Sequence, residues 1–252
     1  MRFKLGKKIA RPEAVKLKFG AYFKADLLPT VPAVFGRPWL ITQWGMLAND
    51  TVGDCVWASA DHRTMLLCAE AGSKVPVFTP TTATADYSAA TGYTPTDPST
   101  DQGTDMTAAA AYQQKIGVLD INGDRHKTNI YTALNVSNLD ELARAVYLFG
   151  AVDIGVQLPE TAQDQYNEAV PWDVTSSSTE GGHCIPIVGR NSAGNWLCVT
   201  WGRLQAITPA FITAYMDEGI VSLSLERLNA KGLSPESYNQ AQLLDDFKQV
   251  TA

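Results

Sequence analysis

Apolar residues recur at helical spacing in the first half of the chain. Residues 54 to 71, DCVWASADHRTMLLCAEA, form one such run, and Gly72 follows it. Asp54 has the side chain of a good N-cap, so we predict a helix that begins there and ends at Gly72. Four residues of this segment can share one buried face: Val56, Ala60, Met65 and Cys68.

Further helices are predicted on both sides of the middle of the chain. Residues 80 to 92, PTTATADYSAATG, and 106 to 117, MTAAAAYQQKIG, are typical of helices, and Gly117 closes the second. Residues 138 to 150, NLDELARAVYLFG, form an amphipathic pattern that Asn138 can cap.

The second half changes to short runs of β-type residues. Four runs separated by turn residues are typical of strands: residues 151 to 158, 183 to 190, 195 to 202 and 220 to 226. A short helix is expected over residues 208 to 219, and a closing helix over residues 234 to 250. Helices thus dominate one half and strands the other, which predicts an α+β fold with segregated layers.

The N-terminal segment differs from the rest of the chain in charge. Residues 1 to 24 hold eight Lys or Arg and one acidic residue, Glu13, a balance of +7 within a chain whose net charge is −6. The remaining residues therefore carry −13. Such a basic arm can bind nucleic acid, an acidic partner surface or lipid headgroups. It can equally be a solvated tail or lie on the acidic body of its own chain, and both interpretations stay open.

The composition is that of a globular protein. Of the 252 residues, 45% are hydrophobic and 18% are charged, which is ordinary for a soluble domain. No window approaches 18 consecutive apolar residues, so no membrane span is expected. The N-terminus lacks the apolar core of a secretory signal, so we expect a cytoplasmic location. Cys184 and Cys198 flank a predicted hairpin and could face each other, although free thiols are the default in a reducing compartment.

Cys55 stands at the start of the first predicted helix, where the helix N-terminus favours a thiolate. A nucleophilic thiol also needs an imidazole, and the chain has three histidines. His62 lies seven residues after Cys55, roughly 10 Å along the helix axis, and so cannot take the thiol proton. His126 stands in a polar loop. His183 follows two glycines and leads into an apolar strand, which makes it the candidate base.

No cofactor or metal is expected. The sequence has no glycine-rich phosphate loop, no Cys-x-x-Cys, no His-x-x-x-His and no carboxylates clustered at metal spacing. Cys184 adjoins His183, but neighbouring strand residues face opposite sides of a sheet, so the two are not expected to share one ion.

The order and spacing of these segments resemble the papain-like cysteine peptidases. In that family a cysteine near the mature N-terminus is followed about 130 to 150 residues later by a histidine and an asparagine. Here His183 lies 128 residues after Cys55. Four segments carry the resemblance: NDTVGDCVWAS, DQGTDMTAAAAYQQKIG, ELARAVYLFGAVDIGV and GGHCIPIVGRNSAGNWLCVTWG. The resemblance implies a helical half whose central helix carries the cysteine, an antiparallel β-barrel-like half, and a cleft between them.

The resemblance also implies roles for four residues. Cys55 would be the nucleophile, and His183 its general base and acid. Asn49, six residues before Cys55, would donate its side-chain N–H to an oxyanion hole, and Trp201 would shield the histidine. The alternative interpretations are a helix-start cysteine in an inactive protein, a turn asparagine and a core tryptophan.

Three features depart from the pattern of the family. Val199 stands where the asparagine that orients the histidine is expected, and we expect Thr200 to face the other side of the strand as a poor substitute. Asp54 places a negative charge beside the thiol, which raises a thiol pKa. Only 54 residues precede Cys55, so no inhibitory prodomain is expected. These departures favour weak, narrow or absent proteolysis.

Three further segments resemble papain-like proteins encoded by tailed bacteriophages and prophages: ATGYTPTDPSTDQGTDM, AVYLFGAVDIGVQLP and VTWGRLQAITPAFITAYMDEGIVSLS. This resemblance implies a place in the host cytoplasm or in the virion. The first hypothesis is a cysteine hydrolase that cleaves a peptide or isopeptide bond of a peptide or protein substrate. The alternative is a catalytically weak or inactive virion component, such as a capsid decoration or a minor head or tail protein. A third hypothesis is an effector that modifies a host protein.

We expect the chain to have four parts: a basic arm over residues 1 to 26, a helical half over 27 to 135, a β half over 136 to 225 and a helical tail over 226 to 252. Virion proteins are the candidate partners of the arm. Direct binding of nucleic acid is not expected.

Overall fold

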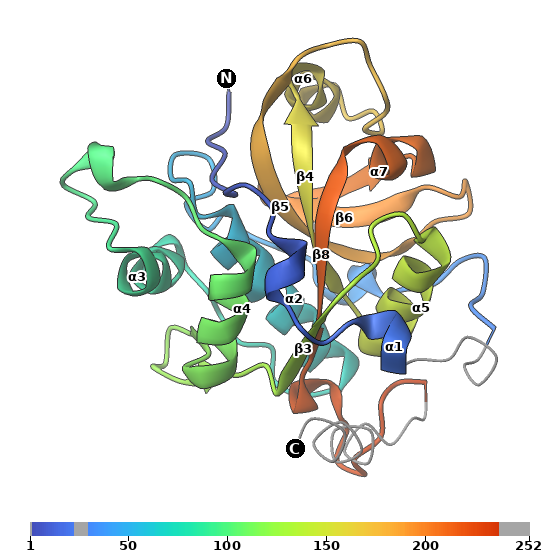
Figure 1. Cartoon of the computed structure of the whole chain (residues 1–252). Coiled ribbons are helices and arrows are strands. Elements are labelled where there is room, and N and C mark those ends of the chain that lie inside the picture. Colours follow the sequence, from blue (N-terminus) through green and yellow to red (C-terminus); the bar gives the residue numbers. More distant parts are fainter. Residues whose placement is uncertain (1, 23–29, 237–252) are drawn as a thin grey trace.

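Two halves lie side by side in the computed structural model, which describes residues 2 to 22 and 30 to 236 (Figure 1). The first half contains three helices and a short hairpin: α2 (Cys55–Glu70), α3 (Pro80–Thr91), α4 (Met106–Lys115), β1 (Val118–Leu119) and β2 (Arg125–His126). The second half is built on one antiparallel sheet of six strands, in the order β3-β8-β4-β5-β6-β7.

The strands of this sheet are β3 (Ile130–Ala133), β4 (Val152–Pro159), β5 (Thr179–Arg190), β6 (Trp196–Thr200), β7 (Arg203–Ile207) and β8 (Met216–Leu223). Its helices are α5 (Leu139–Phe149), α6 (Glu160–Asn167) and α7 (Pro209–Tyr215). Helix α5 packs against β4, β5 and β8, and α2 packs against β5. The remaining elements are α1 (Phe19–Tyr22) and the 3-10 turns η1 (Pro12–Ala14), η3 (Pro38–Leu40), η4 (Pro98–Thr100) and η5 (Leu225–Arg227).

The predicted α+β fold with segregated layers is confirmed. The helices predicted over 54 to 71, 80 to 92, 106 to 117 and 138 to 150 are α2, α3, α4 and α5, each within two residues of its expected ends. Most of the closing helix expected over residues 234 to 250 lies outside the described residues. None of the described helices is long and apolar enough to cross a membrane.

Helix α2 is buried on every side, and not on one face as its pattern predicted. All its residues from Cys55 to Cys68 are buried, because α3 and α4 cover it on one side and β5 on the other. Its polar residues therefore need internal partners. His62 is a core histidine whose Nε2 lies 3.0 Å from the carbonyl oxygens of Trp44 and Gly45.

Arg63 on α2 needs internal partners most, because its guanidinium is charged and its side chain is only 4% exposed. It forms an ion pair with Asp153 on β4, and its other terminal nitrogen donates to Gln113 Oε1 at 2.6 Å. Ser59 donates to the second oxygen of Asp153 at 2.7 Å. This network ties the central helix to the sheet.

The region from residue 203 to 223 differs from its prediction. The helix expected over 208 to 219 ends at Tyr215, and Met216 already begins β8. The strand β7 was not predicted at all. β7 lies at the edge of the sheet beside β6 and also bonds to Trp172, and the acidic start of β8 is paired with Lys7 of the N-terminal arm. These contacts leave no local pattern in the sequence.

The four cysteines are free thiols. Cys198 on β6 is the register partner of Ile187 on β5. Cys184 lies three residues before Ile187 on β5, opposite Gly155 of β4. The two cysteines therefore do not face each other across the hairpin, and the pairing considered from the sequence is wrong.

We expect Asp153→Ala to destabilise the protein by about 3 kcal/mol or more, because it leaves the buried Arg63 charge without its partner. The matched control is Asp164→Ala, which removes the partner of Arg2 in an ion pair whose side chains are 57% and 48% exposed; a loss of about 1 kcal/mol or less is expected there. Urea denaturation of the two variants measures the difference. Equal losses would contradict the role given to Asp153.

Candidate active site

Cys55 is the first residue of α2, and only 1% of its surface is exposed. Burial raises the pKa of its thiol to about 12, and Asp54 acts in the same direction. The backbone of Cys184 and of Gly6 lies against the sulfur and lowers its pKa, as does the Lys7 ammonium. The thiol is therefore protonated at neutral pH in this conformation.

His183 lies on β5, one residue before Cys184, and its ring is fully buried. Its Nε2 is hydrogen-bonded to Thr200 Oγ1 at 2.8 Å. Its Nδ1 is buried and has no hydrogen-bond partner. Burial lowers the pKa of His183 to about 3, so the ring is neutral at neutral pH. The structure thus brings the predicted base to the strand segment that touches the Cys55 sulfur.

Thr200 occupies the position that the sequence interpretation had given to Val199. Val199 packs into the core around α2 together with Cys184, whereas His183 and Thr200 face away from that core. Val199 and Thr200 face opposite sides of β6, as expected. His183 lies on the side of Thr200 and bonds to its hydroxyl, so the expectation that Thr200 is a poor substitute for the orienting asparagine was wrong. The tautomer that suits a general base has its proton on Nε2, donated to Thr200, and a free lone pair on Nδ1.

Trp201 stacks on the His183 ring, with ring centroids 4.9 Å apart and planes 21° from parallel. Its other neighbour in the stack is Phe3, at 4.6 Å and 20°. Trp201 is 2% exposed and has a left-handed backbone, with φ of 45°. The Trp201 ring therefore lies over the His183 ring and is also part of the hydrophobic core. This placement is compatible with both interpretations from the sequence, a shield of the histidine and a core tryptophan.

Asn49 and Asp54 are paired beside the thiol. Asn49 Nδ2 donates to Asp54 Oδ1 at 3.2 Å, and Asp54 Oδ2 is buried without a partner. Asp54 stands at the N-cap position of α2, but its side chain makes no capping bond, contrary to expectation. Burial raises the pKa of Asp54 well above its usual range, which reduces the negative charge beside Cys55. Asn49 as an oxyanion donor stays a prediction.

The N-terminal arm runs between the two halves (Figure 1), and the backbone of Gly6 lies against the Cys55 sulfur. Its backbone is bound on both sides: Lys7 N–H donates to Gly182 O at 3.0 Å, and Lys8 N–H donates to Thr104 O at 3.0 Å. Thr104 N–H donates in turn to Gly6 O at 2.7 Å. Residues 6 to 8 thus connect β5 to the segment that precedes α4.

Glycines line the path of the arm. A Cβ atom on Gly6 would lie 1.9 Å from Gly53 O, one on Gly103 2.2 Å from Gly6 O, and one on Gly182 2.3 Å from Lys7 O. Since real side chains do not approach so closely, the arm fits only because these positions carry no side chain. Gly53 lies two residues before Cys55, and Gly182 lies directly before His183. The arm therefore fits closely beside both candidate catalytic residues.

Lys7 anchors the arm inside the protein. Its side chain is fully buried, and its Nζ lies 2.9 Å from Asp217 Oδ2 and 3.3 Å from Glu218 Oε1 at the start of β8. Gly155 makes room for the Lys7 side chain, because a Cβ there would lie 2.0 Å from Lys7 Cε. A buried ammonium with two carboxylates is a specific contact that a solvated tail would not make.

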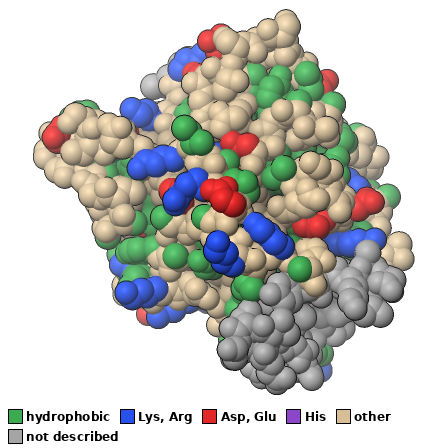
Figure 2. All heavy atoms as spheres, viewed as in Figure 1, with side chains coloured by type: hydrophobic (Ala, Val, Ile, Leu, Met, Phe, Trp, Pro, Cys, Tyr) green, Lys and Arg blue, Asp and Glu red, His purple; other side chains and the backbone are tan. Residues whose placement is uncertain are grey.

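Three other basic residues of the arm also form ion pairs with acidic residues of the same chain. The pairs are Arg2 with Asp164 and Glu180, Lys4 with Asp101, and Arg11 with Asp105. Figure 2 shows basic and acidic side chains gathered in the middle of this face. The arm therefore lies on the acidic body of its own chain, one of the two interpretations left open by its charge.

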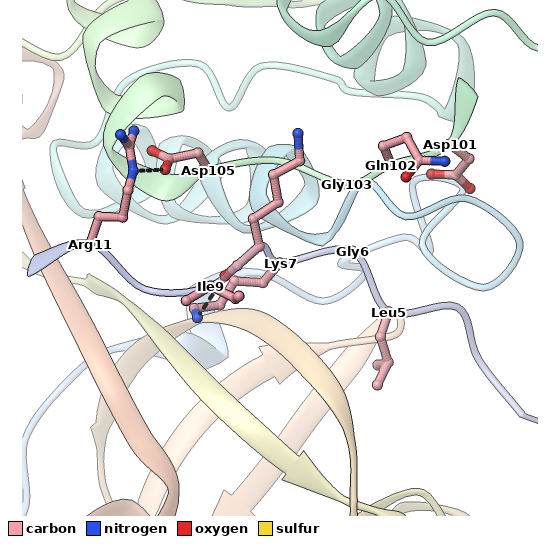
Figure 3. Close-up of a pocket in the computed structure, with 10 residues that line it drawn as sticks. Leu5, Gly6, Lys7, Ile9, Arg11, Asp101, Gln102, Gly103 and Asp105 are labelled. Carbon is pink, nitrogen blue, oxygen red and sulfur yellow. Dashed lines mark hydrogen bonds and ion pairs between the residues drawn. The ribbon is translucent and has the colours of Figure 1, made fainter. Parts of the chain in front are cut away.

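The space left over the arm is a groove of about 670 Å³ (Figure 3). Its walls come from the arm itself and from four residues before α4: Asp101, Gln102, Gly103 and Asp105. Neither Cys55 nor His183 lines this groove. A substrate in the groove would be separated from the thiol by the backbone of the arm.

The sequence left open where the arm lies and did not predict its contact with the turn before Cys55. The glycines at positions 53, 103 and 182 were the signal that could have found it, since a glycine outside a turn often marks the close approach of another backbone. Their partner could not be named, because Gly6 and Gly182 lie far apart in sequence.

Several solved structures of cysteine proteases align with this chain over most of its length. Xylellain, a cysteine protease from Xylella fastidiosa, aligns with a TM-score of 0.64 at 12% identity, over 89% of this chain and 98% of that one. Procathepsin B S9 from Trypanosoma congolense aligns with a TM-score of 0.61 at 11% identity, over 87% and 86%. The Amb a 11 cysteine protease of ragweed pollen, in its proform, aligns with 0.58 at 16% identity, over 82% and 70%.

No model of a protein family and no curated protein matches the sequence. The chain nevertheless has the fold of the papain-like cysteine proteases, as expected from the order of its motifs. Cys55 is the first residue of the central helix α2, and His183 lies on β5, which packs against that helix.

We expect Gly6→Ala to expose Cys55, because the added Cβ collides with Gly53 O and displaces the arm. Water then reaches the thiol and its pKa falls, and each unit of that fall raises the thiolate fraction at neutral pH about tenfold. Iodoacetamide labelling followed by peptide mass spectrometry measures the rate at Cys55. Ile9→Ala, in a side chain that is 85% exposed, is the control and should leave the rate unchanged. Equal rates in the two variants would show that the arm does not protect the thiol.

Proposed function

We propose that the chain is a latent cysteine hydrolase of the papain type that cleaves a peptide or isopeptide bond of a protein substrate. The bond from His183 Nε2 to Thr200, which leaves Nδ1 free, carries this proposal. A histidine inherited by an inactive protein has no need of a substitute for the missing asparagine. Here the Thr200 hydroxyl supplies such a hydrogen bond to the ring.

The reaction needs the arm to leave. With the cleft open, water solvates both groups, so the pKa of Cys55 falls and that of His183 rises toward their ordinary values. A proton then passes from the thiol to Nδ1 of His183, and the helix N-terminus and the imidazolium stabilise the thiolate. The covered conformation, with neutral thiol and neutral ring, is the resting state.

The chemistry that follows uses the same two side chains. The thiolate attacks the carbonyl carbon of the scissile bond, and the oxyanion is held by the backbone N–H of Cys55, with Asn49 as the candidate second donor. Collapse breaks the carbon–nitrogen bond, and the amine leaves with the proton of His183. Water, deprotonated by His183, then hydrolyses the thioester and releases the carboxylic acid and the thiol.

We expect the Gly6→Ala protein to cleave fluorogenic peptides drawn from a pooled library, and Gly6→Ala/Cys55→Ser to be inactive. In the Gly6→Ala background, Thr200→Val should lower kcat by at least about tenfold, because the ring loses its orienting bond. Thr200→Ser keeps the hydroxyl and should retain most of kcat. Activity that survives Cys55→Ser, or an equal kcat for Thr200→Val and Thr200→Ser, would contradict the assignment.

A second candidate is a virion component without catalysis, in the cytoplasm or particles of a phage-infected host. The observation that favours it is the filled cleft, in which neither the thiol, with its pKa near 12, nor the imidazole, with its pKa near 3, is charged at neutral pH. The resemblance of three segments to phage-encoded papain-like proteins supports this setting. The basic arm would then exchange its own acidic partners for those of a capsid or tail protein.

For this second candidate we expect the chain to co-purify with phage particles, and a form that lacks residues 1 to 24 to be lost from them. Cys55→Ser is the matched control and should remain attached, since a structural role does not use the thiol. Quantitative immunoblotting of gradient-purified particles measures both. Absence of the full chain from the particles rules this candidate out and leaves the hydrolase unaffected.

A further inference from the structure

Three metal-ligating side chains meet at the end of α2 that lies away from Cys55. Cys68 belongs to α2, His126 to β2 and Glu226 to η5, and one ligand atom of each lies within 4.8 Å of the others. Cys68 follows Cys55 by 13 residues of helix, or about 20 Å along the axis. The cluster is therefore separate from the candidate active site.

Glu226 stands between the other two residues. Its Oε1 lies 2.9 Å from His126 Nδ1, and its Oε2 lies 3.4 Å from Cys68 Sγ. Around a tetrahedral zinc ion with bonds of about 2.0 to 2.3 Å, ligand atoms are roughly 3.5 Å apart. These two contacts use different oxygens of Glu226, and one ligand atom of each residue lies within 4.8 Å of the other two, so side-chain rotations can bring three ligand atoms to the separations that such an ion requires.

The second ring nitrogen of His126 supplies an independent observation. This Nε2 is buried and has no hydrogen-bond partner, yet it lies 3.8 Å from Asp120 Oδ2. The Asp120 carboxylate is held in place by the backbone N–H groups of Asn122 and Asp124, each at 2.9 Å. Histidines that bind metals through one nitrogen commonly direct the other to a carboxylate, which fixes the ring.

The chemistry of the donors and their exposure select the ion. A thiolate, an imidazole and a carboxylate together suit Zn²⁺, whereas Mg²⁺ and Ca²⁺ prefer oxygen ligands alone. Cys68 is 5% exposed, but the side chains of His126 and Glu226 are 17% and 27% exposed, so an ion and one water can enter from solvent.

We propose that Cys68, His126 and Glu226 bind one zinc ion, with water as the fourth ligand and Asp120 as the residue that positions His126. On binding, the Cys68 thiol loses its proton and His126 binds through unprotonated Nδ1, so protons are released and the affinity falls as the pH falls. The ion joins α2, the β1–β2 hairpin and the segment after β8, and acts on stability rather than on the reaction.

Cobalt(II) is the probe for this site, because a thiolate bound to it gives a charge-transfer absorption band in the near ultraviolet. Untagged, chelator-treated full-length protein is titrated with Co²⁺, and then with Zn²⁺ to displace it. We expect one Co²⁺ per chain, loss of the band on adding Zn²⁺, and a higher melting temperature with Zn²⁺. Cys68→Ser should abolish the band, and His126→Gln and Glu226→Gln should abolish the rise in melting temperature.

Two matched variants separate this site from other thiols. Cys55→Ser and Cys198→Ser each remove a buried thiol outside the cluster and should keep the full band. Asp120→Asn keeps an oxygen acceptor for the turn, and should keep the band but weaken Zn²⁺ binding by about 10- to 100-fold. The proposal is overturned if no band forms, if Cys68→Ser retains it, or if Cys55→Ser removes it. None of these outcomes depends on hydrolase activity.

Discussion

The complete enclosure of α2 is the constraint on which the rest of the structure depends. A helix buried on every side cannot leave Arg63 or His62 without partners, so the sheet and the loop before the helix must supply them. Once those partners are fixed, the helix has one position between its neighbours. Its first residue, Cys55, is then held against β5, and its last turns bring Cys68 to the hairpin and η5.

Ion pairs hold the N-terminal arm against both halves of the protein. Four of the eight basic residues of the arm pair with acidic residues that lie on both halves, from Asp101 on one side to Glu218 on the other. Each buried contact would be costly if its partner were absent, because a charge in the interior needs an opposite charge beside it. The arm therefore binds as a unit, and it joins the two halves across the candidate active site.

Local patterns were enough to predict much of this architecture. The helix that carries Cys55, the strand that carries His183 and the division into two layers follow from apolar spacing and turn residues, and the order of motifs identified the fold. Thr200 was set aside because the sequence shows that Val199 and Thr200 face opposite ways but not which of them faces His183. The contact of Gly6 with Gly53 and that of Cys68 with Glu226 join residues 47 and 158 positions apart, for which a single sequence carries no periodic signal.

The path of the arm shows which side chains the space between the two halves accommodates. An aromatic ring fits over Trp201, a residue without a side chain passes Gly53, and a long cation reaches the pair of carboxylates on β8. Phe3, Gly6 and Lys7 meet these requirements in that order along five residues of chain. The arm is thus complementary in shape and charge to the cleft that it fills. A short peptide with the sequence of the arm is a starting template for a competitive ligand of the proposed open form.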